Sequence, residues 1–93
     1  MSFEEPSWAR LFLSRYHYRV RFGSEGKDGK MRTSDGRSPV AYVQVISWSA
    51  ESARQKAIAT ARSLYRDDNV VQREPARAEG YRLYSIGWKR RGA

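Results

Sequence analysis

The chain has 93 residues, of which 40% are hydrophobic and 30% charged, so it has room for one small globular domain and is not a disordered segment. Its 18 Lys and Arg against 10 Asp and Glu give a net charge of +8, which favours an anionic partner such as nucleic acid or an acidic protein surface. The absence of cysteine excludes disulfides, thiolate metal sites and a thiol nucleophile, and it suits the cytoplasm, where we expect the protein to act.

The N-terminal region is predicted to form a short helical turn from Pro6 to Leu13, with Trp8, Leu11 and Phe12 covering one edge of the core. Its acidic start is not that of a secretory signal. No apolar run in the sequence approaches the length of a membrane span, so we expect no membrane association.

The strongest pattern is a strict alternation over residues 15–22, which is typical of a half-buried β-strand. The apolar face of this strand carries Tyr16, Tyr18, Val20 and Phe22. The opposite face carries Arg15, His17, Arg19 and Arg21. Three arginines on one face of a strand, in a chain of this charge, indicate a surface for an anionic partner.

Residues 23–39 are polar and rich in glycine, and they predict either a long flexible basic loop or a hairpin extension folded about Asp28-Gly29. The cations of this arm are Lys27, Lys30, Arg32 and Arg37. A solvated loop without a binding role is the alternative.

The second strand is predicted from Val40 to Trp48 and, being apolar on both faces, is expected at the centre of the sheet. If the small and β-branched side chains from Ala41 to Ser47 face the core, the side chains left on the open face are Tyr42, Gln44, Ile46 and Trp48. Ser49 is the predicted N-cap of a helix from Ala50 to Tyr65. Its alanine-rich face, with Ala53, Ala57 and Ala61, suits close packing over the large side chains Tyr18, Phe22 and Val43.

The C-terminal third is predicted to contain a third strand from Val70 to Glu74, a polar turn from Pro75 to Gly80 and a fourth strand from Tyr81 to Lys89. A basic tail over residues 89–93 follows. Residues 1–93 are therefore expected to form a single α+β domain, in the order β-β-α-β-β. We expect a mainly antiparallel four-stranded sheet with one principal helix packed on one face.

A sheet face that mixes arginines with tyrosine and tryptophan is suited to single-stranded nucleic acid, since cations contact phosphates while rings stack on bases. We therefore predict a small non-enzymatic protein that binds nucleic acid or a nucleoprotein complex. The predicted binding residues are Arg15, His17, Arg19, Arg21, Lys27, Lys30, Arg32, Arg37, Tyr42, Trp48, Lys89, Arg90 and Arg91. A single histidine without a nucleophile motif predicts no catalytic triad, and no metal site or cofactor is expected.

Two alternatives remain open. The aromatic residues of the open face could instead be covered by the N-terminal segment or by a second subunit, because arginine and aromatic residues are also enriched at protein interfaces. In function, the chain could be an inhibitor that docks on a host protein assembly, for example a phage or mobile-element accessory factor directed against a defence system. We expect a monomer in isolation, because repulsion between two arginine-bearing strands opposes their direct pairing.

Overall fold

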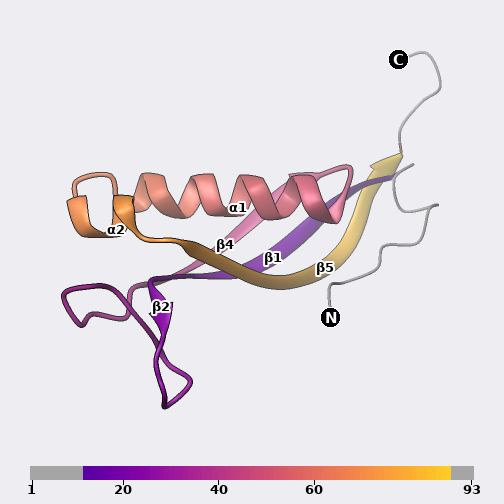
Figure 1. Cartoon of the computed structure of the whole chain (residues 1–93). Coiled ribbons are helices and arrows are strands. Elements are labelled where there is room, and N and C mark those ends of the chain that lie inside the picture. The colour runs from indigo at the N-terminus through magenta and orange to yellow at the C-terminus, as the bar shows by residue number, and fades with distance from the viewer. Residues whose placement is uncertain (1–11, 89–93) are drawn as a thin grey trace.

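The computed structural model describes residues 12–88, which form an antiparallel sheet with one long helix lying across one of its faces (Figure 1). In chain order the elements are β1 (Phe12–Phe22), β2 (Ser24–Glu25), β3 (Met31–Arg32), β4 (Val40–Ser47), α1 (Ala50–Leu64), α2 (Asn69–Arg73) and β5 (Ala76–Trp88). The main sheet has three strands, and β2 and β3 form a separate two-stranded hairpin. The α+β class and the antiparallel sheet with one main helix are confirmed, whereas the predicted four strands in the order β-β-α-β-β match only roughly, because the main sheet has three strands.

The strand order in the main sheet is β4-β1-β5, with β1 antiparallel to both neighbours. The prediction that the Val40–Trp48 strand is central is therefore wrong. It lies at an edge, and its residues alternate between exposed and buried positions. Three of its four outward side chains are hydrophobic and yet exposed, namely Val40, Tyr42 and Ile46, and Tyr42 is the most exposed of them at 67%. Because β1 is the central strand, two β1 strands cannot pair edge to edge, but its arginines still lie on the open face that a second subunit would have to cover.

The free edge of β4 is covered at both ends by side chains of the helical segment. The Tyr65 hydroxyl donates a hydrogen bond to the carbonyl oxygen of Val40 at 3.1 Å, and Lys56 Nζ donates to that of Ile46 at 3.0 Å. An exposed strand edge is a template for pairing with another chain. These two contacts shorten the part of β4 that remains available for such pairing.

The core lies between the sheet and α1, as the sequence predicts. Ala53, Ala57 and Ala61 are fully buried on the helix. The sheet side chains that share their cluster are Tyr16, Tyr18, Val20, Phe22, Ala41, Val43 and Val45. Small side chains on the helix let it lie close to a sheet of larger ones. The Tyr18 hydroxyl also donates to the carbonyl oxygen of Ala50 at 2.9 Å, which fixes the start of α1 over β1.

Helix α1 begins where the sequence predicts. Ser49 adopts an extended conformation, and its hydroxyl accepts a hydrogen bond from the backbone N–H of Ser52 at 3.1 Å. This satisfies one of the N–H groups that a helix start leaves without an internal partner. Ser49 is therefore confirmed as the N-cap.

The predictions for residues 70–80 are wrong. The expected strand from Val70 to Glu74 is the short helix α2, because Asp68 accepts hydrogen bonds from the backbone N–H groups of Val70 and Val71 and so starts a helical turn. The expected turn from Pro75 to Gly80 is the beginning of β5. Small residues at 76, 78 and 80 alternate there with charged ones at 77 and 79, which is strand periodicity with a small-residue face toward α1.

The ends of α1 and α2 cap each other. Gln72 donates from Nε2 to the carbonyl oxygens of Arg62 and Tyr65 near the end of α1, at 3.0 and 2.9 Å. In return, Arg62 donates to the carbonyl oxygens of Val71 and Glu74 near the end of α2, at 3.1 and 2.9 Å. Carbonyl groups at helix ends otherwise have no partner within the helix. The two helices therefore form one unit at this end of the sheet.

Region 23–39 contains the β2–β3 hairpin over residues 24–32, followed by a second turn. The β2–β3 pair closes through a turn in which Gly29 donates to Gly26 and adopts a φ of 78°. A second turn closes at Gly36, whose φ is 83°. The hairpin projects on the side of the sheet opposite α1 (Figure 1).

At the limits of the described range, Phe12 and Leu13 begin β1 and are not part of a helical turn. The remainder of that predicted turn lies outside the described residues. Within residues 12–88, no helix is both long enough and apolar enough to cross a membrane.

Replacing Gly80 with alanine is expected to destabilise the fold. A Cβ at this position would lie 1.9 Å from the carbonyl oxygen of His17 and 2.7 Å from Cδ1 of Tyr18, so the backbone of β1 would have to move. We expect Gly80→Ala to lower the free energy of unfolding by about 1–3 kcal/mol, measured by urea denaturation. Gly26→Ala is the control, because the nearest atom to its Cβ is 3.3 Å away on a side chain. Equal stability of the two variants would contradict the close packing of β5 on β1.

Candidate nucleic-acid interface

The face of the main sheet opposite α1, called here the open face, carries side chains from all three strands. Residues paired across antiparallel strands point to the same side, so the register defines its members. They are Val40, Tyr42, Gln44 and Ile46 from β4, Arg15, His17, Arg19 and Arg21 from β1, and Arg77, Glu79, Tyr81 and Tyr84 from β5. The predicted placement of the β1 cations beside Tyr42 is confirmed.

Three rings form a band across the middle of the open face. The ring centroids of His17 and Tyr42 are 6.2 Å apart with planes 22° apart, and those of His17 and Tyr81 are 5.6 Å apart with planes 45° apart. Tyr42 is 67% exposed and Tyr81 is 55% exposed. The band therefore offers solvent a nearly continuous aromatic surface that spans β4, β1 and β5, one ring from each strand.

A fourth ring reaches the same face through an irregularity in β5. Arg15 pairs with Tyr84 whereas Tyr16 pairs with Arg82, so Leu83 is an extra residue without a partner in β1. This bulge changes which residues face outward, and it puts Tyr84 on the same side as Tyr81. The Arg15 guanidinium lies over the Tyr84 ring at 6.0 Å, which is within the range of a cation–π contact.

The other end of the open face is cationic. Arg21 and Arg77 are directly opposite each other on β1 and β5, and Arg19 is opposite Glu79. Arg21 donates a hydrogen bond to Glu79, and Arg19 approaches the same carboxylate at 3.9 Å. The bond from Arg21, assisted by attraction from Arg19 and Arg77, holds the pKa of Glu79 below its ordinary value. One carboxylate is therefore set among three arginines.

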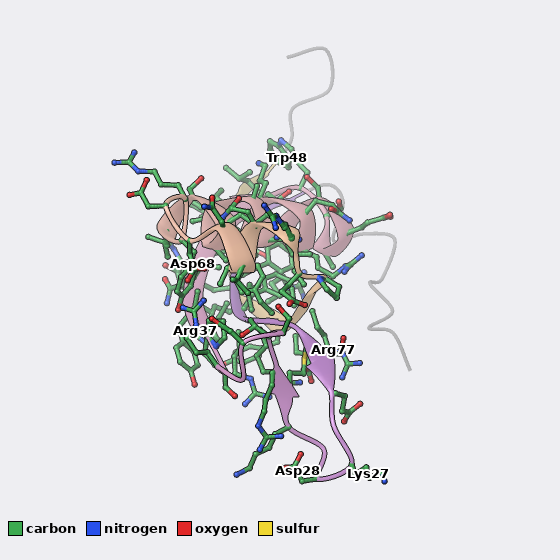
Figure 2. The ribbon with its side chains drawn as sticks, turned by 60° about the vertical axis from the view of Figure 1, so that its left-hand side comes forward. Lys27, Asp28, Arg37, Trp48, Asp68 and Arg77 are labelled. Carbon is green, nitrogen blue, oxygen red and sulfur yellow. The ribbon has the colours of Figure 1, made fainter. Side chains whose placement is uncertain are left out.

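The β2–β3 hairpin extends this cationic end. Arg77 and Glu25 form an ion pair at 3.7 Å, which ties the hairpin to β5. Figure 2 shows Lys27 and Asp28 at the tip of the hairpin, well away from the rest of the molecule. Lys27 and Lys30 are exposed and form no ion pair with any described residue. They are therefore available to a partner on this side of the sheet.

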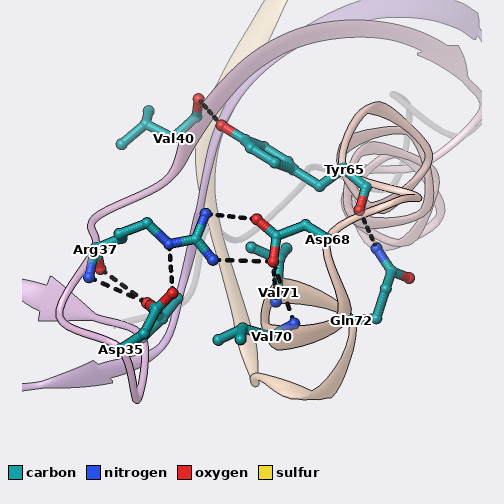
Figure 3. Close-up of polar contacts among 9 residues, drawn as sticks. Asp35, Arg37, Val40, Tyr65, Asp68, Val70, Val71 and Gln72 are labelled. Carbon is teal, nitrogen blue, oxygen red and sulfur yellow. Dashed lines mark hydrogen bonds and ion pairs between the residues drawn. The ribbon is translucent and has the colours of Figure 1, made fainter.

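Two of the predicted binding cations are held by carboxylates of the chain. Arg32 makes hydrogen bonds of 2.7 and 3.1 Å with Asp28, which, with a backbone bond from Lys30, lower the pKa of Asp28 to about 2. Arg37 makes bonds of 2.6 and 2.9 Å with Asp68 and one of 2.6 Å with Asp35 (Figure 3). Both guanidinium groups therefore hold turns in place rather than standing free.

The contact between Arg37 and Asp68 joins the second turn of region 23–39 to α2. Asp68 is also the N-cap of α2, so the same carboxylate starts the helix and receives the guanidinium (Figure 3). The turn is held a second time where the backbone N–H of Ser34 donates to Glu74 Oε1 at 2.8 Å. The bonds from Arg37, with the backbone bond from Val71, lower the pKa of Asp68 to about 2.

Of the remaining predicted residues, Trp48 does not join the ring band. Trp48 follows the end of β4 and lies at the opposite end of the molecule from the hairpin tip (Figure 2). It is six residues from Tyr42, or roughly 20 Å along an extended chain, so the two rings do not form one stacking surface. Lys89, Arg90 and Arg91 lie outside the described residues.

None of the four open-face members from β5 was predicted to lie there, namely Arg77, Glu79, Tyr81 and Tyr84. The first two stand in the segment expected to be a turn, although its alternation of small and charged residues is a strand signal. Tyr81 belongs to the predicted fourth strand, but the sequence pattern did not show which of that strand's side chains point to the open face. Tyr84 lies on this face only because of the bulge at Leu83, and no local sequence pattern predicts that bulge.

No protein-family model matches the chain, and no curated protein or solved structure shows significant similarity to it. Within residues 12–88, no group of three His, Asp or Glu side chains is placed to hold a metal ion. The chemistry of the open face is therefore the basis for a functional proposal.

The ion pair between Arg37 and Asp68 is expected to give the protein a stability that is lost in acid. The folded-state pKa of Asp68, about 2, is below its ordinary value of 3.8. The contribution is therefore present above pH 4 and disappears as the pH falls toward 2. Asp68→Asn retains a good N-cap and removes the charge. We expect this variant to be less stable than the wild type in urea at pH 7, with the difference shrinking between pH 4 and pH 2.

The control for this experiment is Asp67→Asn, because the Asp67 side chain is 97% exposed and makes only a long contact of 4.0 Å with Arg66. We expect its stability to follow that of the wild type at every pH. A difference between Asp68→Asn and wild type that stays constant from pH 7 to pH 2 would show that the ion pair contributes nothing.

Proposed function

We propose that the protein binds single-stranded nucleic acid, alone or within a nucleoprotein complex, through the open face. The observation that carries this proposal is the band formed by Tyr42, His17 and Tyr81, exposed on a sheet and bordered by arginines. Successive bases stack on aromatic rings of this kind, while neighbouring cations contact the backbone. Each of the three strands supplies one ring, so the band offers room for more than one base.

The cations divide into two groups around the band. Arg15 lies beyond it on the side of Tyr84. On the side of the hairpin, Arg19 borders it as the cross-strand partner of Tyr42, and Arg21 lies one position further out on the same face. A strand that crosses the band would meet a guanidinium group on either side. Lys27 and Lys30 extend the positive surface past the sheet, where they would contact further phosphates without reading sequence.

Single strands suit this surface better than a duplex. Tyr42 and Tyr81 present ring faces that a base can reach only when it is not already stacked between its neighbours. The described helices carry no comparable row of cations on one face, whereas duplex readers commonly insert a helix into the major groove. The proposal therefore rests on stacking with electrostatic support, and on no contact to the edge of a particular base.

Removing a ring of the band should weaken binding without disturbing the fold. We expect Tyr42→Ala and Tyr81→Ala each to raise the Kd for a fluorescent single-stranded oligonucleotide by about five- to hundredfold, since stacking of one base contributes about 1–3 kcal/mol. The readout is fluorescence anisotropy at several salt concentrations. Affinity should also fall steeply as salt rises, because each phosphate contact releases counterions.

Leu64→Ala is the matched control, because Leu64 is 66% exposed and lies on α1, across the sheet from the band. It should bind as the wild type does. Binding that does not change with salt, or that survives loss of both tyrosines, would rule out the open face as the site.

A protein partner is the second candidate, and the apolar side chains near Arg15 favour it. Ile46 and Tyr84 flank Arg15 on the open face, and the nearby Leu83 and Ile86 are also exposed. Aromatic, aliphatic and arginine side chains together are typical of the buried centre of a protein interface. On this alternative the chain is an inhibitor, such as a phage or mobile-element accessory factor, docked on a host assembly.

Capture from a nuclease-treated lysate separates the two candidates. If nucleic acid is the ligand, partners recovered with the wild-type protein should disappear after nuclease treatment. The inhibitor alternative predicts a defined protein that survives nuclease and is lost with Ile46→Asp but retained with Leu64→Asp, which places the same charge on the outer side of the molecule.

A further inference from the structure

Three arginines lie next to Glu79 in the register of the open face, and the guanidinium groups of two of them, Arg21 and Arg19, contact its carboxylate. Arg21 and Arg77 are cross-strand partners, and Arg19 is the partner of Glu79. The Glu79 carboxylate is bonded to Arg21 and is 3.9 Å from Arg19. Arg77 is two residues from Glu79 on the same face of β5, and its guanidinium contacts Glu25 at 3.7 Å. Its positive charge also helps to lower the pKa of Glu79, after the larger effects of Arg21 and Arg19.

The cluster of positive charges around Glu79 is stable only with a negative charge beside it. Like charges directly opposite each other on neighbouring strands are destabilising, and Arg21 faces Arg77 in this way. On the other side of β1, the partners of Arg21 and Arg19 are Val40 and Tyr42, which carry no charge at neutral pH. Glu79 is therefore the carboxylate that offsets this cluster from within the sheet, while Glu25 contacts Arg77 from the hairpin.

A phosphate group is suited to the place that the Glu79 carboxylate occupies. Guanidinium groups bind carboxylate and phosphate oxygens with the same planar hydrogen-bonding geometry, and a phosphate has more oxygen atoms to share among three arginines. Glu79 is also half-exposed, with 51% of its side chain open to solvent, so its carboxylate can move away without unfolding the sheet. The place of the Glu79 carboxylate is thus open to solvent, and arginines that can bind an anion lie beside it.

We propose that Arg19, Arg21 and Arg77 form a phosphate-binding subsite that Glu79 occupies in the free protein. The phosphate is that of a nucleic-acid strand whose bases stack on the ring band, and this assignment rests on the proposed function. Arg19 is two residues from His17 along β1, or about 7 Å, so the subsite adjoins the band. Glu79 acts as a built-in competitor: it keeps the arginines in place without ligand, and it weakens binding of weakly charged anions.

The decisive variant is Glu79→Gln, which keeps the shape of the side chain and removes its charge. Without added anion we expect its Tm to be lower than that of the wild type, because the arginines repel one another. Sodium pyrophosphate, compared with sodium chloride at equal ionic strength, should raise the Tm of Glu79→Gln more than that of the wild type, since a ligand stabilises the state that binds it. For the oligonucleotide, Glu79→Gln should lower the Kd by about two- to fivefold.

Asp67→Asn is the matched control, because it makes the same change in charge at a fully exposed position away from the open face. It should respond to pyrophosphate as the wild type does. If pyrophosphate raises the Tm of Glu79→Gln no more than it raises the Tm of the wild type and of Asp67→Asn, the cluster is only a structural ion pair and the proposed subsite is wrong.

A second measurement, by NMR, needs no variant. Pyrophosphate should shift the side-chain N–H resonances of Arg19 and Arg21. It should leave the resonance of Arg54 on α1 unchanged, so Arg54 serves as the internal reference.

The two proposals fail in different ways. If pyrophosphate binds at Arg19, Arg21 and Arg77 but the oligonucleotide does not bind the protein, the subsite stands and nucleic acid is not its ligand. If the oligonucleotide binds through Tyr42 and Tyr81 while Glu79→Gln leaves its Kd and the pyrophosphate response unchanged, the proposed function stands and the subsite is wrong.

Discussion

The rest of the structure depends on β1 being paired on both sides. A strand with neighbours at both edges has no backbone left for solvent, so its side chains alone decide what each face of the sheet becomes. Tyr16, Tyr18, Val20 and Phe22 take one side and are buried there. The cations between them are consequently held on the other side, at the spacing of the strand and in register with β4 and β5. The core and the candidate interface are thus two sides of one segment.

Small residues make this division workable in so short a chain. The alanines of α1 and the Ala76–Gly80 segment of β5 allow the helix and the strands to approach closely, so a core of few residues is well filled. The polar contacts then lie at the periphery. Mutual capping of the helix ends and the contact of Arg37 with Asp68 hold the turns around the sheet without placing charge inside it.

The sequence predicts those parts of the fold that depend on long, regular patterns. The alternation of β1 and the alanine spacing of α1 each extend over eight or more residues, so the facing of Arg19 and the packing face of α1 were predictable. The apolar residues on both faces of β4 instead led to a wrong prediction that this edge strand is central. Other errors occur where a single contact decides the outcome. Asp68 turns two valines into a helix, and an extra residue at Leu83 reverses the facing of Tyr84. Arg37 looks like a free cation until the fold brings Asp68, distant in sequence, beside it.

The contacts of Lys56 and Tyr65 with the backbone of β4 have a consequence for solubility at high concentration. A sheet polymerises into a fibre only when both of its edges accept new strands, since each added chain must leave one edge for the next. With the β4 edge obstructed at both ends, a chain that pairs at β5 leaves only a shortened edge for the next addition. Two side chains of one helix therefore make open-ended growth of this sheet unfavourable, although its aromatic and β-branched strands would otherwise be prone to it.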